Sequence, residues 1–95
     1  MYKLSFYVLE NHLASVKEAI FSAGGGMYGE FRNCAWEAKG VGQYQGSNDT
    51  LNCNPEYKVE ILCQPVYLHK AIEALKLSHP CPNPIFYFMK VETDL

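Results

Sequence analysis

Two stretches of the chain show the same change of hydrophobic period, from strand spacing to helix spacing. Residues 2–9 alternate apolar and polar side chains as a strand does, and residues 12–23 then carry apolar side chains at helical spacing until three glycines follow. The same succession recurs at 57–63 and 65–77, where Pro65 suits the first turn of a helix. Each half of the chain is therefore predicted to be a strand followed by a helix.

Two further strands complete the predicted order. Residues 30–38 (EFRNCAWEA) are predicted to form one of them, and residues 85–92, rich in aromatic and β-branched side chains, the other, while residues 39–54 are rich in turn-forming residues and are interpreted as a long hairpin connection. The order β-α-β-β-α-β predicts a ferredoxin-like α+β fold, in which one antiparallel sheet carries both helices on one face. We expect residues 1–95 to form one domain, because the chain is too short for a second core.

The sheet face away from the helices is predicted to be too apolar for a solvated surface. Such a face usually marks an interface, so we expect the chain to form a homo-oligomer. The alternative is that residues 39–54 fold across the sheet and cover it. The residues expected on this face are Tyr7, Leu9 and Leu62, together with either Phe86 and Phe88 or Ile85, Tyr87 and Met89.

Composition argues against several classes of protein. Eight basic and ten acidic residues give a formal charge of −2, and no Lys/Arg cluster is present, so we expect no nucleic-acid partner. No apolar run approaches membrane-spanning length and the first residues lack the pattern of a signal peptide, so we expect a cytoplasmic protein without membrane contact. Four cysteines without a C-x-x-C pair are expected to be free thiols.

Gly24, Gly26 and Gly29 have the G-x-G-x-x-G spacing of a phosphate-binding loop. A dinucleotide site needs a strand before these glycines and a helix after them, so that the helix N-terminus faces the phosphates. Here the glycines follow a helix, whose C-terminal end repels anions. We therefore predict that they shape the turn from the first helix into the next strand.

A soft-metal site for copper or zinc has three candidate ligands in His79, Cys81 and Cys34, since imidazole and thiolate suit these ions. Their spacing matches no recognised ligand pair. The alternative is that His79 bonds the last carbonyls of the preceding helix and that the thiols only pack. No nucleophile with a base and no marked carboxylate pair is present, so we expect no enzymatic activity.

The glycines also belong to a longer pattern. The chain resembles the small domain inserted in bacterial proteins of the Ngg-one-interacting-factor-three (Nif-three-like) family, a domain that also occurs as a stand-alone short protein. The matching residues fall in three motifs: Gly24, Gly26, Gly29, Phe31 and Cys34; then Gly40, Gly42 and Tyr44; and finally His79, Pro80, Pro84 and Phe86.

The resemblance implies the fold of the CutA and PII signalling proteins, which assemble as trimers with their sheets packed inward. It implies a small binding or regulatory module with a small-molecule or protein partner. Two alternatives remain: a CutA-type metal-binding protein, and a purely structural oligomerisation unit. A cleft between subunits would be the ligand site, and the matched motifs would supply to it Tyr28, Glu30 and Tyr44, with Cys34, His79 and Cys81 beside them.

Two departures from the family pattern limit what the resemblance implies. Where the family commonly has Tyr-Glu-Glu between two prolines, this chain has Cys81-Pro82-Asn83, so any role of those carboxylates is absent or altered. The full-length proteins bind two metal ions through flanking regions, and the three histidines here lack the spacing for such a centre. Among the matched residues, a structural role is expected for Gly24, Gly26, Gly29, Gly40 and Gly42.

Overall fold

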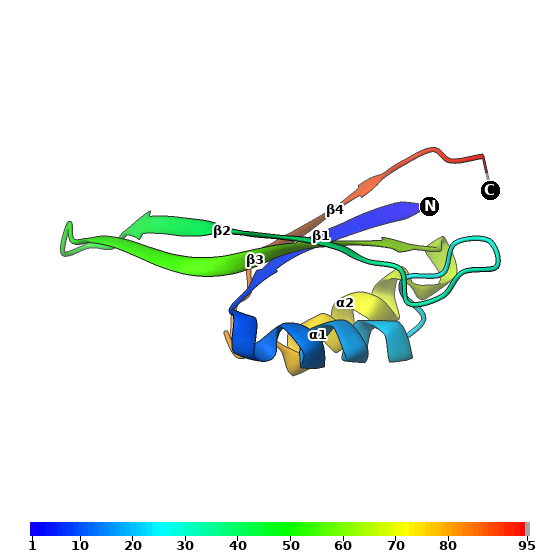
Figure 1. Cartoon of the computed structure of the whole chain (residues 1–95), viewed down its shortest axis with the longest axis horizontal. Helices are drawn as coiled ribbons and strands as arrows, with labels where there is room; N and C mark the ends of the chain where they lie inside the picture. Colours follow the sequence, from blue (N-terminus) through cyan, green and yellow to red (C-terminus); the bar gives the residue numbers. More distant parts are fainter. Residues whose placement is uncertain (95) are drawn as a thin grey trace.

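The computed structural model describes residues 1–94 and shows a four-stranded antiparallel sheet in the order β2-β3-β1-β4. Both helices lie on one side of this sheet (Figure 1), so the predicted ferredoxin-like fold is confirmed. In chain order the elements are β1 (Tyr2–Val8), α1 (Glu10–Ser22), β2 (Trp36–Gln45), β3 (Leu51–Cys63), the 3-10 turn η1 (Pro65–Tyr67), α2 (Leu68–Ser78) and β4 (Phe86–Lys90).

The hydrophobic core lies between the helices and the two central strands. The alternation in β1 places Leu4, Phe6 and Val8 against the helices, and all three are buried. Helical spacing gives α1 and α2 one apolar stripe each, which covers these side chains. The remaining buried members of the core are Val16 and Ile20 from α1, Val59, Ile61 and Cys63 from β3, and Leu68, Ala71 and Leu75 from α2.

The pairing register decides which side chains reach the opposite, open face of the sheet. Lys3 pairs with Leu62 and Met89, and Ser5 pairs with Tyr87. These residues alternate with the core residues of β1, so Tyr87 and Met89 belong to the open face. Of the two sets that the sequence left open for β4, the structure therefore places Tyr87 and Met89 there and turns Phe86 and Phe88 toward the helices.

The predicted bounds of the second strand, 30–38, and of the hairpin connection, 39–54, are both wrong. β2 begins only at Trp36 and then continues to Gln45, where it pairs with Leu51 across a short turn. The turn is closed by the Asp49 N–H, which donates to the Gly46 carbonyl at 3.0 Å. Most of the supposed connection is therefore a regular two-stranded ribbon.

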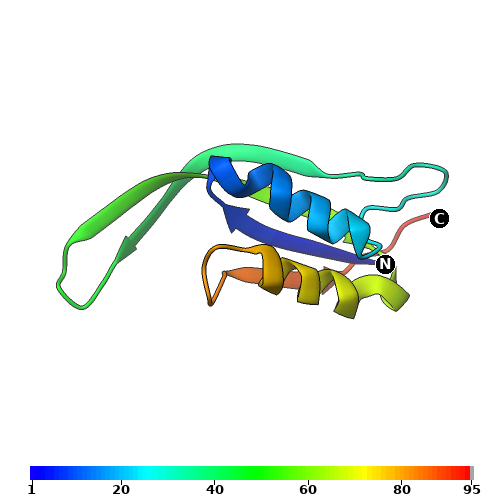
Figure 2. The same cartoon turned by 90° about the horizontal axis from the view of Figure 1, so that it is seen from below.

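This ribbon extends away from the body of the protein. β1 stops pairing with β3 at Tyr57, so residues 51–56 of β3 pair with β2 alone. We call residues 40–56 the arm. Figure 2 shows the arm reaching beyond the helices, so it does not fold across the sheet as the alternative supposed. The radius of gyration is 14.1 Å and the longest extent is 47 Å, whereas a compact chain of this length has a radius of about 12 Å.

The other predicted elements differ from the observed ones only at their ends. The first helix begins two residues earlier than the predicted range 12–23, with Leu9 as its N-cap. The range 65–77 divides into η1 and α2, which ends at Ser78. The last strand is shorter than the range 85–92. None of the helices within residues 1–94 is long and apolar enough to cross a membrane.

Candidate functional site

The glycine segment ends α1 with a Schellman motif. The Gly24 N–H donates to the Phe21 carbonyl at 3.1 Å, and the Gly25 N–H donates to the Ile20 carbonyl at 3.0 Å. These are the two hydrogen bonds that define the motif. Gly24 has a φ of 104°, and a Cβ at this position would lie 2.6 Å from the Tyr67 ring. A side chain here would be strained and would also lack room.

Gly26 connects the same turn to the sheet. Its N–H donates to the Leu62 carbonyl at 2.8 Å, and its carbonyl accepts from the Cys34 N–H at 2.9 Å. The N–H groups of Gly24, Gly25 and Gly26 thus all donate within the chain. A phosphate site needs a row of such amides facing the ligand. The hydrogen bonds of the fold already use the donors that a phosphate would need.

Three of the residues predicted for a ligand cleft lie in the segment after these glycines. Tyr28 and Phe31 exchange two backbone hydrogen bonds, of 3.0 and 2.9 Å, around a turn in which Gly29 has a φ of 58°. Glu30 is exposed at the tip of this turn, and Cys34 is half-buried where the segment returns to the sheet. The segment lies beside the C-terminal end of β3.

Tyr44 lies at the other end of β3. It pairs with Asn52 on the arm, whereas Gly26 bonds Leu62, ten positions further along the strand. Ten residues of extended strand span roughly 33 Å. Within one chain, the structure therefore does not bring Tyr44 together with Tyr28 and Glu30.

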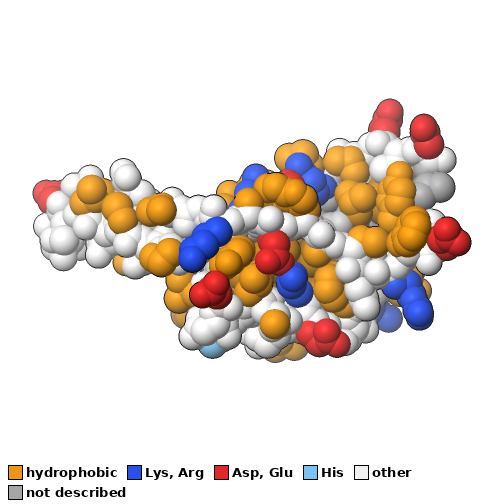
Figure 3. Space-filling view, viewed as in Figure 1, with side chains coloured by type: hydrophobic (Ala, Val, Ile, Leu, Met, Phe, Trp, Pro, Cys, Tyr) orange, Lys and Arg blue, Asp and Glu red, His pale blue; other side chains and the backbone are white. Residues whose placement is uncertain are grey.

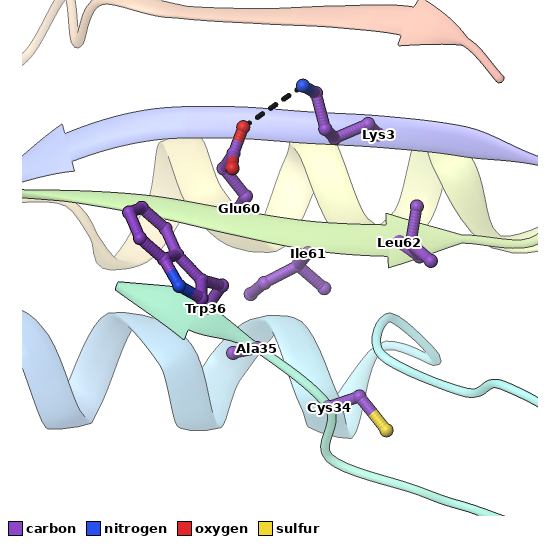
Figure 4. Close-up of a pocket in the computed structure, with 7 residues that line it drawn as sticks. All are labelled: Lys3, Cys34, Ala35, Trp36, Glu60, Ile61 and Leu62. Atoms are coloured by element: carbon purple, nitrogen blue, oxygen red, sulfur yellow. Dashed lines mark ion pairs between the residues drawn. The ribbon is translucent and has the colours of Figure 1, made fainter. Parts of the chain in front are cut away.

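A small cavity of about 290 Å³ lies between the start of β2 and the end of β3 (Figure 4). Lys3 and Glu60 form an ion pair of 3.0 Å across its edge, between β1 and β3. Trp36 lies at the first position of β2 with 57% of its surface exposed. The Cys34 side chain lies at the far end of the group and points away from the ion pair. This cavity is shallow and mainly apolar.

A larger cavity of about 650 Å³ lies among the base of the arm, the end of β1 and the segment 79–85. Its lining includes Tyr44, His79 and Cys81, so three of the predicted residues do meet here. Tyr7 and Glu56 also line it. Its volume falls in the range of small-molecule sites, which makes it the better candidate for a binding site.

His79 is held in one tautomer by two backbone groups. Its Nε2 lies 2.7 Å from the Tyr7 carbonyl, which can only accept, so Nε2 carries the proton. Its Nδ1 accepts from the Cys81 N–H at 3.1 Å. The lone pair that a metal would need is therefore used by the chain. Cys34 lines the other cavity, and within residues 1–94 no three His, Cys, Asp or Glu side chains are grouped closely enough to hold a metal ion.

The open face carries a cluster of polar groups at its centre. The hydroxyls of Tyr7 and Tyr87 lie 3.3 Å apart. Hydrogen bonding to Tyr7, and then to the Lys58 ammonium, lowers the pKa of Tyr87, and the bond to Tyr87 raises the pKa of Tyr7. Lys58 also lies 4.0 Å from Glu60, which binds Lys3. Apolar side chains flank this cluster, notably Leu62, Trp36 and Met89.

Sequence reasoning did not place Trp36 on the open face or Glu56 in a cavity. Both assignments depend on the pairing of β2 with β3, in which Trp36 lies opposite Glu60 and Gly40 opposite Glu56. The sequence did hold one signal for a strand here. Glycines 40 and 42 are two residues apart, as neighbouring positions on one face of a strand are. The sequence does not show which side chain uses the space that they leave.

The sheet order and the two helices on one face define a ferredoxin-like fold, which solved CutA structures share. CutA from Xylella fastidiosa superposes with a TM-score of 0.80 at 15% identity, covering 99% of this chain and 86% of that one. A Bacillus cereus protein related to NIF3 superposes with a TM-score of 0.90 at 22% identity, covering 97% of this chain and 26% of that one. These likenesses show the fold.

The curated relatives point to the same family as the sequence motifs. The GTP cyclohydrolase 1 type 2 homolog of Listeria monocytogenes is 33% identical over 104 residues, which cover 96% of this chain and 28% of the relative. No family model matches the chain. The chain resembles the inserted domain of the Nif-three-like family, as the motifs predicted, and it spans about a quarter of the length of the curated relatives.

Proposed function

We propose that this chain is a self-associating binding module whose copies pack through the open sheet face. The observation that supports this is the exposure of large apolar side chains on a face that no helix covers. Trp36 is 57% exposed, Met89 is 46% exposed and Tyr87 is 38% exposed, and all three lie on that face. Large exposed apolar side chains beside a polar cluster on an uncovered sheet face are typical of an interface between protein copies.

The arm supports the same proposal. In Figure 3 it projects from the body as a narrow extension that carries hydrophobic side chains. Val41, Tyr44 and Leu51 on the arm are each more than half exposed. A two-stranded ribbon is only marginally stable in water unless a further strand or a helix packs against it. A second copy of the chain packed against the arm would supply that contact.

We propose three copies, because the CutA and PII proteins that the sequence resembles assemble in that number. The larger cavity, at the base of the arm, is the proposed ligand site, where a neighbouring copy would close it further.

We propose a cytosolic location, which suits the four free thiols. We propose no reaction for the chain, although the name of its curated relatives refers to a cyclohydrolase.

Light scattering on two matched variants tests the interface. Met89→Asp places a charge on the open face, whereas Leu77→Asp places one on α2, where Leu77 is 81% exposed. We expect the wild type and Leu77→Asp to have three times the chain mass of 10.8 kDa, and Met89→Asp to approach the mass of one chain. A wild type that is monomeric at micromolar concentration would contradict the proposal.

A further inference from the structure

The larger cavity has an unusual balance of charge. Its lining contains one carboxylate, that of Glu56, and neither lysine nor arginine. Lys39 and Lys58 line an adjoining depression, which shares Tyr7 and Glu56 with this cavity. His79 adds no positive charge in the tautomer fixed by Tyr7 and Cys81. Among the described residues that line the cavity itself, an anionic ligand would therefore meet a carboxylate and no ammonium or guanidinium group.

The Glu56 carboxylate lies over the glycine at position 42. A Cβ built on Gly42 would lie 2.3 Å from Oε1 of Glu56, so the absence of a side chain at 42 leaves the space that the carboxylate occupies. None of the ion pairs or side-chain hydrogen bonds found within residues 1–94 involves Glu56. Its oxygens are thus free to accept hydrogen bonds from a ligand.

Two tyrosines line the same cavity as this carboxylate. Tyr44 is 58% exposed and lines the cavity from the arm, while Tyr7 lines it from the end of β1. The hydrogen bond to Tyr87 is the main cause that raises the pKa of the Tyr7 phenol; Lys58 lowers this pKa, and Glu56 raises it by a smaller amount, so the carboxylate acts on this ring. Aromatic faces attract cations, and an organic cation is held best where a carboxylate lies beside such faces.

We propose that this cavity binds an organic cation, a ligand bearing an ammonium or guanidinium group, with Glu56 as its counter-ion and Tyr44 and Tyr7 beside the charge. The proposal rests on the proposed function, since it names the chemical class of ligand for the same cavity. A metal ion is a poorer occupant, because one carboxylate and a hydrogen-bonded imidazole supply too few ligands.

A series of probes of similar size and different charge tests this. Phenethylamine is a cation, phenethyl alcohol is neutral and hydrocinnamate is an anion at neutral pH. Backbone amide chemical shifts of residues 42–44 and of His79, Cys81, Asn83 and Ile85 report binding at the cavity. We expect phenethylamine to bind about tenfold more tightly than hydrocinnamate, with the alcohol between them.

Two variants assign that preference to Glu56. Glu56→Gln removes the charge and should bring the amine and the acid to similar affinity. Glu73→Gln removes an exposed carboxylate from α2 and should leave the preference unchanged. Gly42→Ala keeps the charge but displaces the carboxylate, so it should weaken amine binding as well.

Three results would overturn the inference: equal or tighter binding of hydrocinnamate, a preference that survives Glu56→Gln, or no shift with phenethylamine at tens of millimolar. The mass of the same samples separates this failure from that of the proposed function. Assembled protein that shows no preference for the amine would overturn the organic-cation inference alone, whereas monomeric wild-type protein would contradict self-association.

Discussion

β3 runs through two regions with different physical support. Its second half, from Tyr57 to Cys63, pairs with β1 and contributes the buried residues Val59 and Ile61 to the core. Its first half, within the arm, pairs only with β2, and Leu51 there is 54% exposed. Both halves are hydrogen-bonded strand, but only the second half pairs with β1 and buries an apolar face against the helices. Strand pairing therefore gives the arm its shape, while it leaves the arm without a core.

The largest effect that distinguishes the two regions should come from shortening apolar side chains. In the Met89→Asp background, which we expect to be monomeric, Ile20→Ala should lower the free energy of unfolding by about 3–4 kcal/mol, because Ile20 is fully buried. Val41→Ala should lower it by less than about 1 kcal/mol, since Val41 is 72% exposed on the arm. Urea denaturation measures both. Equal losses would show that the arm packs as tightly as the body.

A second comparison uses one glycine from each region. Gly24→Ala should cost about 2 kcal/mol, because φ at this position is 104° and the new Cβ would meet the Tyr67 ring. Gly40→Ala adds a Cβ where no atom lies within 4 Å, so its free energy of unfolding should stay near that of the wild type. Thermal denaturation of the pair measures the difference. A harmless Gly24→Ala would contradict the geometry of the turn after α1.

A smaller effect should come from pH. Burial raises the pKa of the Cys63 thiol to about 11, and the Gly26 backbone N–H only partly offsets this. In the unfolded chain the thiol ionises at lower pH, so between the two pKa values the folded state binds more protons than the unfolded state. Stability should therefore be unaffected below the unfolded pKa and fall as pH rises toward 11, by about 1 kcal/mol at pH 10.

The Cys63→Ala variant is the control for this pH dependence, because tyrosines titrate in the same range. The difference between wild type and variant isolates the thiol, which belongs to the body; Cys53, on the arm, is exposed. Chemical denaturation at pH 8, 9 and 10 would follow it. Parallel pH profiles for wild type and Cys63→Ala would show that the buried thiol does not carry the effect.

The body could be predicted from the sequence because its elements have buried faces. Leu4, Phe6 and Val8 show the two-residue apolar spacing of a strand, and Val16 and Ile20 show the spacing of a helix, because each side chain points to the core. The arm has no comparable apolar pattern. Its side chains are exposed on both faces, so no apolar alternation distinguishes residues 39–54 from a loop.

The larger cavity was only partly predictable, for a related reason. His79 and Cys81 could be named because they follow α2 in an evident break of the helix. Glu56 could not, since its place beside Gly42 depends on the register of a ribbon that the sequence did not predict. Long-range strand register is set by tertiary packing and turn geometry more than by local preference.

The central claim is that a second copy of the chain supplies the packing that the arm lacks. Amide hydrogen exchange at residues 41–45 and 51–54 tests it most directly, in the wild type and in Met89→Asp. We predict protected arm amides in the assembled wild type and rapid exchange of the same amides in the monomeric variant, while β1 amides stay protected in both. Arm amides that exchange equally in the two proteins, despite their different masses, would contradict the claim.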